Sequence, residues 1–250
     1  IRSIDAQRPI MLTFVPDSSL DQLVGLHLAA APEIDLIGIN AFYPKAFQQA
    51  KEELDAIGTS RPLLLSEFGP IGYWDASQSP RERNGTLAEP TDFDKVQAYQ
   101  SWWTTIDTAR QNWLGGAAYN WQSIHSGTST WFGLTDQAGR LKPAYYGLAE
   151  SWLGQKVDFP LAEIYVSPSD PLWYRRSRLQ LSVISPLLQQ DSYEVEWYLK
   201  AESRGLSKSF RKVGEGPSVS FSAPAFSSRL YVFLSDDQGN VTTASRVINP

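Results

Sequence analysis

The residues best suited to chemistry stand at the ends of apolar, strand-like segments of the chain. Glu67 closes one of these segments. Asn40 and Tyr43 close the segment before it, and Trp121 closes the segment after it. The carboxyl ends of consecutive parallel strands meet at one rim, so a carboxylate, an amide, a phenol and an indole should gather there. This set predicts a site that combines a nucleophilic acid with hydrogen-bonding and stacking groups.

Glu67 is the central candidate, because it follows three leucines (63–65) where a charge is costly unless it has a partner. A carboxylate held there can attack an anomeric carbon and form a covalent glycosyl-enzyme intermediate. The alternative is a structural glutamate that bonds to the backbone or to Arg61. Its position alone favours neither interpretation.

Three further candidates lie in loops after the strands. Trp74 and Trp131 are each as suited to stacking on a sugar ring as to packing within their loops. His125 follows Trp121 and could hydrogen-bond to a ligand hydroxyl, although a surface histidine would look the same. The two histidines and the absence of cysteine provide no metal-site spacing. No metal or organic cofactor is implied by the function considered below.

Positioning these residues requires a particular order of elements. Over residues 1–154, short apolar runs alternate with helical periodicity, which predicts parallel strands joined by right-handed helical crossovers. A doubly wound sheet and a barrel both fit this pattern. A complete (β/α)8 barrel needs eight units and about 250 residues, so a barrel could be only half present. The predicted strands are 9–15, 35–43, 62–68 and 115–121.

Local signals indicate where the intervening helices begin and end. Ser18 and Asp21 resemble a capping box for the first helix. Thr91 should cap the third helix after a long polar loop (69–91), and a last helix should open at Pro143 and end at Gly154.

Residues 155–250 have a different character. Helical periodicity is replaced by short alternating runs, and Asp236–Asn240 is typical of a hairpin turn. This pattern predicts an immunoglobulin-like β-sandwich without a disulfide. Its clearest predicted strands are 179–183, 193–199, 218–221, 229–234 and 241–247.

The run Arg-Pro-Leu-Leu-Leu-Ser-Glu-Phe-Gly (61–69) resembles the seventh strand of the clan-A glycoside hydrolases, where this glutamate is the nucleophile. Other segments resemble, in turn, the clan's sixth strand, its eighth strand, its closing segment and the join before its fifth strand: residues 34–43, 115–121, 132–146 and 1–9. The resemblance implies an α/β fold that is the C-terminal half of a (β/α)8 barrel at residues 1–154, followed by the all-β sandwich at 155–250.

This resemblance also implies an activity, that of a retaining β-glycosidase acting on a β-linked polysaccharide or oligosaccharide such as a β-glucan. Glu67 would be the nucleophile, Tyr43 would orient it, and Trp121 would form the floor of the sugar subsite. Asn40 would contribute a hydrogen bond. The implied location is extracellular or periplasmic, and transfer to an acceptor sugar would use the same residues.

The sequence motifs account for only one of the two carboxyl groups that the clan uses. The clan's acid/base glutamate stands at the end of its fourth strand, which would precede Ile1. We therefore expect an N-terminal half-barrel to come from the same parent chain or from a partner chain. Asp75, Glu82 and Glu89 have no strand to fix them and are not assigned this role. The alternative is a catalytically inactive carbohydrate-binding or structural module on the same scaffold.

Composition narrows the range of partners. The net charge of −5 and the pI of about 5.1 argue against nucleic acid as the main partner. No run of 18 apolar residues is present, so the sequence contains no transmembrane helix signal. Nine tryptophans and eleven tyrosines fit either large cores or surfaces on which sugar rings stack.

Overall fold

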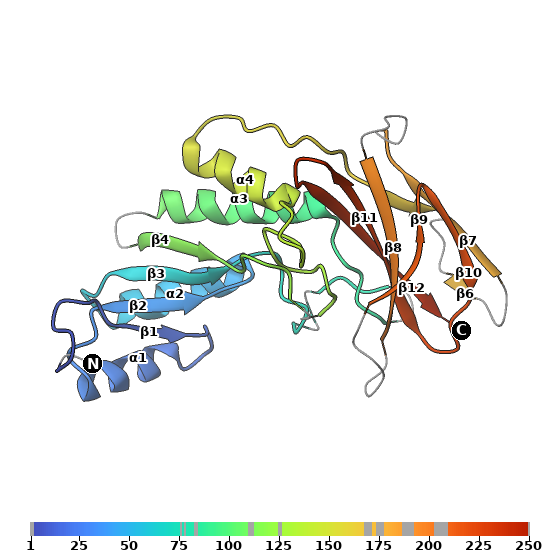
Figure 1. Cartoon of the computed structure of the whole chain (residues 1–250). Helices are drawn as coiled ribbons and strands as arrows, with labels where there is room; N and C mark the ends of the chain where they lie inside the picture. Colours follow the sequence, from blue (N-terminus) through green and yellow to red (C-terminus); the bar gives the residue numbers. More distant parts are fainter. Residues whose placement is uncertain are drawn as a thin grey trace.

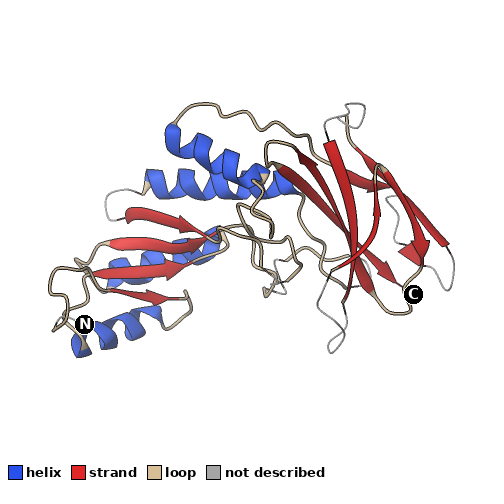
Figure 2. Ribbon diagram, in the orientation of Figure 1, coloured by secondary structure: helices blue, strands red, loops and turns tan. Residues whose placement is uncertain are grey.

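A computed structural model shows an α/β part followed by an all-β part (Figure 1). It describes residues 3–75, 77, 79–82, 85–109, 113–124, 127–167, 172–173, 178–186, 193–202 and 210–249. Figure 2 separates the two parts by colour: in the described residues, the four helices lie with the first sheet, and the second part is strand and loop. The predicted mixture of α/β and all-β structure is confirmed at this level.

The α/β part is built on one parallel sheet with the strand order β1-β2-β3-β4. A helix follows each strand, as the alternating pattern predicts. The strands are β1 (Met11–Phe14), β2 (Leu36–Asn40), β3 (Leu63–Phe68) and β4 (Trp113–Ala118), and the helices are α1 (Leu20–Ala30), α2 (Pro44–Ala56), α3 (Asp92–Thr108) and α4 (Pro143–Leu153).

Helix ends follow the local signals with one exception. Thr91 caps α3 through a reciprocal bond with Asp94, and Gly154 ends α4 with a φ of 65°. The predicted capping box at Ser18 and Asp21 is wrong. The N-cap of α1 is Ser19, whose backbone N–H and hydroxyl both donate to Asp17, at 2.8 and 2.7 Å, so that Asp17 holds the turn before the helix.

Only one face of this sheet is covered by the helices. Alternate side chains such as Ile37 and Leu65 are fully buried among helical residues. On the other face, Met11 of β1 is 39% exposed. β1 is an edge strand, and the open face also carries Gly38, where an added side chain would meet Met11 and Ser66.

The all-β part consists of two sheets that share a core. One sheet has the order β10-β7-β5 and the other β6-β12-β11-β8-β9. Trp197 lies at the centre of the core without exposed surface, and its indole N–H donates to the Gly216 carbonyl at 2.8 Å. The strands are β5 (Tyr165–Ser167), β6 (Leu172–Trp173), β7 (Arg178–Ile184), β8 (Tyr193–Ala201), β9 (Arg211–Glu215), β10 (Ser218–Ser222), β11 (Ser228–Asp236) and β12 (Val241–Asn249).

These strands contain every run predicted for this region, and the predicted turn at 236–240 joins β11 to β12. The relation to immunoglobulin domains and the boundary after residue 154 stay predictions. No helix in the described part of the chain is long and apolar enough to cross a membrane.

A buried ionic cluster joins the two parts near the N-terminus of α3. Lys95 contacts Glu89 at 2.8 Å and Asp92 at 3.1 Å, and Lys142 contacts Asp92 at 3.3 Å. The other Asp92 oxygen accepts hydrogen bonds from the backbone N–H and the hydroxyl of Thr243 in β12, at 2.7 and 2.8 Å. All four charged side chains are less than 5% exposed. This interface was not predicted from the sequence.

Removing one member of this cluster should destabilise the fold strongly. Lys95→Met leaves two buried carboxylates without their shared cation, and breaking a buried ion pair costs about 3–5 kcal/mol. Urea unfolding measures the loss. The control is Lys51→Met, which breaks the exposed Lys51–Asp55 pair and should cost about 0–1 kcal/mol. Equal losses in the two variants would contradict the cluster's importance.

The cluster should also make the stability of the fold depend on pH. Burial disfavours the Glu89 carboxylate, but the charges of Lys95 and Arg229 outweigh it and lower the pKa from 4.5 to about 2. A lowered folded-state pKa means that the stabilisation is complete above about pH 4.5 and is lost as the pH falls towards 2. Glu89→Gln should therefore be less stable at pH 7 and should lose less stability on acidification. Urea titrations between pH 7 and pH 2.5 measure both effects, and parallel curves for variant and parent would refute the assignment.

Candidate functional site

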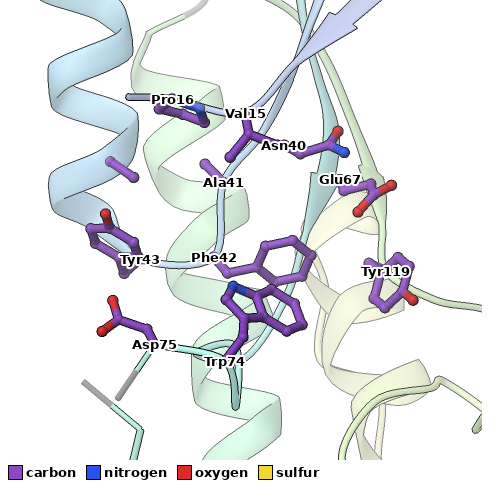
Figure 3. A pocket seen from close by; sticks show the side chains of 11 residues that line it. Val15, Pro16, Asn40, Ala41, Phe42, Tyr43, Glu67, Trp74, Asp75 and Tyr119 are labelled. Carbon is purple, nitrogen blue, oxygen red and sulfur yellow. The ribbon is translucent and has the colours of Figure 1, made fainter. Parts of the chain in front are cut away.

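A pocket of about 430 Å³ lies at the carboxyl ends of the four parallel strands (Figure 3). Each strand contributes to it, either with its last residues or with those that follow. The pocket also receives a segment of the long loop after β3. Its lining residues are Val15, Pro16, Asn40, Ala41, Phe42, Tyr43, Ala46, Glu67, Trp74, Asp75 and Tyr119. This is the rim at which parallel α/β folds place their chemistry.

Glu67 and Asn40 form the polar side of this pocket. They are direct neighbours across β2 and β3. The hydroxyl of Ser66 donates to the Asn40 side-chain oxygen at 2.8 Å, which leaves the Asn40 amide group to donate to Glu67. Burial raises the pKa of Glu67, and the hydrogen bond from Asn40 opposes that rise. The partner is therefore an amide, and not the backbone or Arg61, whose guanidinium donates to the Pro32 carbonyl.

Tyr119 lies beside Glu67, as Figure 3 shows. Burial raises the pKa of Tyr119, and the negative charge of Glu67 raises it further. The backbone of Tyr119 is fixed on both sides, because its N–H donates to Phe68 at 2.7 Å and its carbonyl accepts from Tyr99 at 2.6 Å. Sequence reasoning assigned Tyr119 no role, although its place at the end of the fourth predicted strand was a usable signal.

An aromatic cluster forms the floor of the pocket. The Trp74 indole packs edge-on against Phe42, with ring centres 4.9 Å apart, and stacks on Phe132 at 5.7 Å and 29°. Gly72 passes so close to this indole that an added side chain there would collide with it. The indole is thus fixed on one side, yet Trp74 remains 52% exposed. A rigid, half-exposed indole in a pocket can act as a platform for an apolar ring face.

Tyr43 was expected to orient Glu67; it lines the same pocket, but on the side away from Glu67. Tyr43 is the N-cap residue of α2, with φ −150° and ψ 146°. Its ring lies on the other side of the pocket from Glu67 (Figure 3). Asn40 and Tyr119 occupy the places beside Glu67 instead.

Two predicted tryptophan contacts are also corrected. Trp121 does not line the pocket; it is 62% exposed and packs edge-on against Tyr145 of α4. The chain turns after β4 so that Tyr119, two residues earlier, faces the pocket. Trp131 has no exposed surface, and its indole N–H donates to the Ile71 carbonyl at 2.9 Å, so it supports the loop and is not available to a ligand.

The remaining candidates are placed as follows. His125 lies outside the described residues. Asp75 lines the pocket on the side of Tyr43 and accepts hydrogen bonds from Ser77. Glu89 is buried in the ionic cluster and is unavailable for acid/base chemistry. Within the described ranges, no three histidine, aspartate or glutamate side chains gather as a metal-binding group.

No family model matches the chain, and no curated protein matches it. Several solved structures are similar to it at low identity, and most of those named here are glycoside hydrolases. A β-glucuronidase from Parabacteroides merdae matches 99% of this chain and 32% of its own length, with 11% identity and a TM-score of 0.38. An endo-β-1,4-mannanase from Cellulomonas fimi matches 96% of this chain and 53% of its own length, with 8% identity and a TM-score of 0.31.

A superoxide reductase (neelaredoxin) from Ignicoccus hospitalis matches 34% of this chain and 77% of its own length, with 16% identity and a TM-score of 0.27. The chain thus spans about a third of the glucuronidase and about half of the mannanase.

Replacing Asn40 should raise the pKa of Glu67 further. Asn40→Ala removes the hydrogen bond that favours the carboxylate, and burial then acts alone. Titration of side-chain-labelled glutamate by carbon NMR measures the change. Tyr43→Phe is the control and should leave the Glu67 titration where it is in the parent protein. A larger effect from Tyr43→Phe than from Asn40→Ala would restore Tyr43 as the orienting residue.

Proposed function

We propose that this chain is the nucleophile-bearing part of a retaining β-glycosidase that acts on a β-linked polysaccharide or oligosaccharide such as a β-glucan. One observation carries the proposal: a half-buried carboxylate, hydrogen-bonded by an amide, lies in the same pocket as a half-exposed indole at the carboxyl ends of parallel strands. Extracellular or periplasmic action on such substrates is part of this proposal.

Glu67 is the nucleophile in this mechanism. Its carboxylate attacks the anomeric carbon of the sugar, and the bond from that carbon to the leaving oxygen breaks as an ester forms. The amide of Asn40 holds the attacking group in place through the hydrogen bond that favours its ionised form. The Tyr119 ring lies beside Glu67 (Figure 3), and the negative charge of Glu67 raises the pKa of its phenol. No metal or organic cofactor takes part in these steps.

Trp74 is the proposed platform for the sugar ring. Sugars present flat faces of C–H groups that suit the face of an indole, and Trp74 has a fixed position with one accessible side. It takes the role that the sequence assigned to Trp121. Asp75 follows Trp74 in the lining and provides a carboxylate for sugar hydroxyls on the far side of the pocket.

The acid/base residue is proposed to come from further β/α units, either of the same parent chain or of a partner chain. Parallel sheets are normally covered on both faces, whereas Met11 and other side chains on one face of this sheet are exposed. Strands added beside β1 and β4 would continue the curved sheet and bring a second carboxyl group to the rim. Retaining chemistry requires it about 5–5.5 Å from Glu67.

Covalent trapping tests the nucleophile directly. A 2-deoxy-2-fluoro-β-glucosyl fluoride carries a leaving group that departs without an acid catalyst, so labelling depends on Glu67 alone. Intact-mass and peptide mass spectrometry should find one fluorosugar ester on Glu67 in the parent protein and none in Glu67→Gln. The matched control is Asp75→Asn, which removes the other carboxylate of the pocket and should still be labelled at Glu67.

If no fluoroglycosyl fluoride of the gluco, manno or galacto series labels Glu67 while oligosaccharides still bind, the chain is a catalytically inactive carbohydrate-binding module. Labelling at any other residue would reject Glu67 as the nucleophile. The trapping result therefore distinguishes a glycosidase from a carbohydrate-binding module.

Replacing the platform should weaken sugar binding. Trp74→Ala removes the stacking surface, and aromatic contacts of this kind contribute about 0.5–1.5 kcal/mol, or roughly a 2- to 12-fold change in Kd. Calorimetric titration with cellohexaose and laminarihexaose measures it. Trp121→Ala removes a somewhat more exposed indole outside the pocket and should leave the Kd unchanged. A larger loss of affinity in Trp121→Ala than in Trp74→Ala would identify Trp121 as the stacking surface.

A further inference from the structure

We propose that the β-sandwich is a positioning element of the pocket, which holds Trp74 in place through two loops of the α/β part. Figure 1 shows both loops, after β3 and after β4, between the parallel sheet and the sandwich. The consequence for sugar binding rests on the proposed function, whereas the positioning of Trp74 does not. Three sets of contacts connect the sandwich to the indole.

The first set fixes the far end of the loop after β3. The Arg229 guanidinium of β11 donates to the Leu87 carbonyl at 2.7 Å, and the Ser245 hydroxyl of β12 donates to Glu89 at 2.8 Å. Arg229 is 1% exposed and also bonds Glu202 at 2.8 Å. A buried guanidinium held in this way fixes the position of the loop backbone that it contacts.

Glu89 passes this constraint to the loop after β4. One of its carboxylate oxygens accepts from the Thr130 hydroxyl at 2.6 Å and the other from the Thr128 hydroxyl at 2.6 Å. Both threonines are buried, and Glu89 is also bonded to Lys95. The single carboxylate thus ties the two loops to each other and, through Ser245, to the sandwich.

The second set fixes the loop after β4 directly. The backbone N–H of Ser129 donates to the Tyr231 hydroxyl at 3.0 Å, and Lys200 donates to the Ser129 hydroxyl at 2.6 Å. Tyr231 and Lys200 belong to β11 and β8 of the sandwich. Ser129 and Tyr231 are both buried, so water does not compete for the hydrogen bond between them.

The third set connects this loop to the pocket. Two residues after Ser129, the Trp131 indole donates to the Ile71 carbonyl at the start of the loop after β3. The next residue, Phe132, stacks on Trp74. The chain of contacts therefore runs from β8 and β11 through Ser129 and Phe132 to the indole. Every bond in it is between buried or half-buried groups, so a shift of the sandwich should move the platform.

Fluorine NMR of protein labelled with 5-fluorotryptophan tests the positioning without any ligand. The Trp74 resonance is identified by its loss in Trp74→Phe. The double variant Tyr231→Phe, Lys200→Met removes both sandwich contacts to Ser129 and should shift or broaden the Trp74 resonance. Ser245→Ala, a milder change at Glu89, should move it in the same way, and it serves alone if the double variant does not fold.

The matched control is Val219→Ala, which weakens the sandwich core without touching either loop. It should lower the melting temperature and leave the Trp74 resonance unchanged. The proposal is overturned if the Trp74 resonance is unchanged both in the folded double variant and in Ser245→Ala. It is also overturned if Val219→Ala shifts this resonance by as much as they do. If these variants shift the Trp74 resonance but bind cellohexaose as the parent protein does, the sandwich positions Trp74, but Trp74 is not the sugar platform.

Discussion

The buried carboxylate of Glu89 is the constraint on which the arrangement of the two parts depends. Removing a charge from water is costly, and the cost is met here by a lysine, two threonines and a serine gathered around one side chain. These groups come from α3, from the loop after β4 and from β12. These hydrogen bonds and the ion pair can all form only when the α/β part and the sandwich have one particular relative placement.

The pocket contains a second carboxylate, that of Glu67, which is held less tightly than Glu89. Glu67 is only partly buried, and its pKa is raised by burial and restrained by the single bond from Asn40. The polar side of the pocket is thus carried by strands β2 and β3, whereas its aromatic side is carried by loops. Strands set the position of Glu67, the proposed nucleophile, and the loops, which the sandwich is proposed to fix, set the shape of the space in front of it.

Much of this fold could be read from the sequence, since the apolar runs and helical periodicities reflect burial by local neighbours. Gly154 and Thr91 ended and began helices as their chemistry requires. Of the residues predicted for the site, Glu67, Asn40, Tyr43 and Trp74 line one pocket, with Tyr43 on the side away from Glu67 and Tyr119 beside Glu67, whereas Trp121 is not part of the lining. Which way a side chain points after a strand depends on how the next loop is held. For Trp131 and Glu89 that depends on contacts more than 50 residues away in the chain, which local patterns do not encode.

The bare backbone at Gly72 has a consequence for how such a pocket could diversify. The indole of Trp74 rests where any β-carbon at position 72 would stand. Acquiring even a methyl group there would displace the ring and change the cavity while Glu67 and Asn40 remained untouched. A single codon could in this way alter which molecules the pocket accommodates and leave the proposed nucleophile as it was.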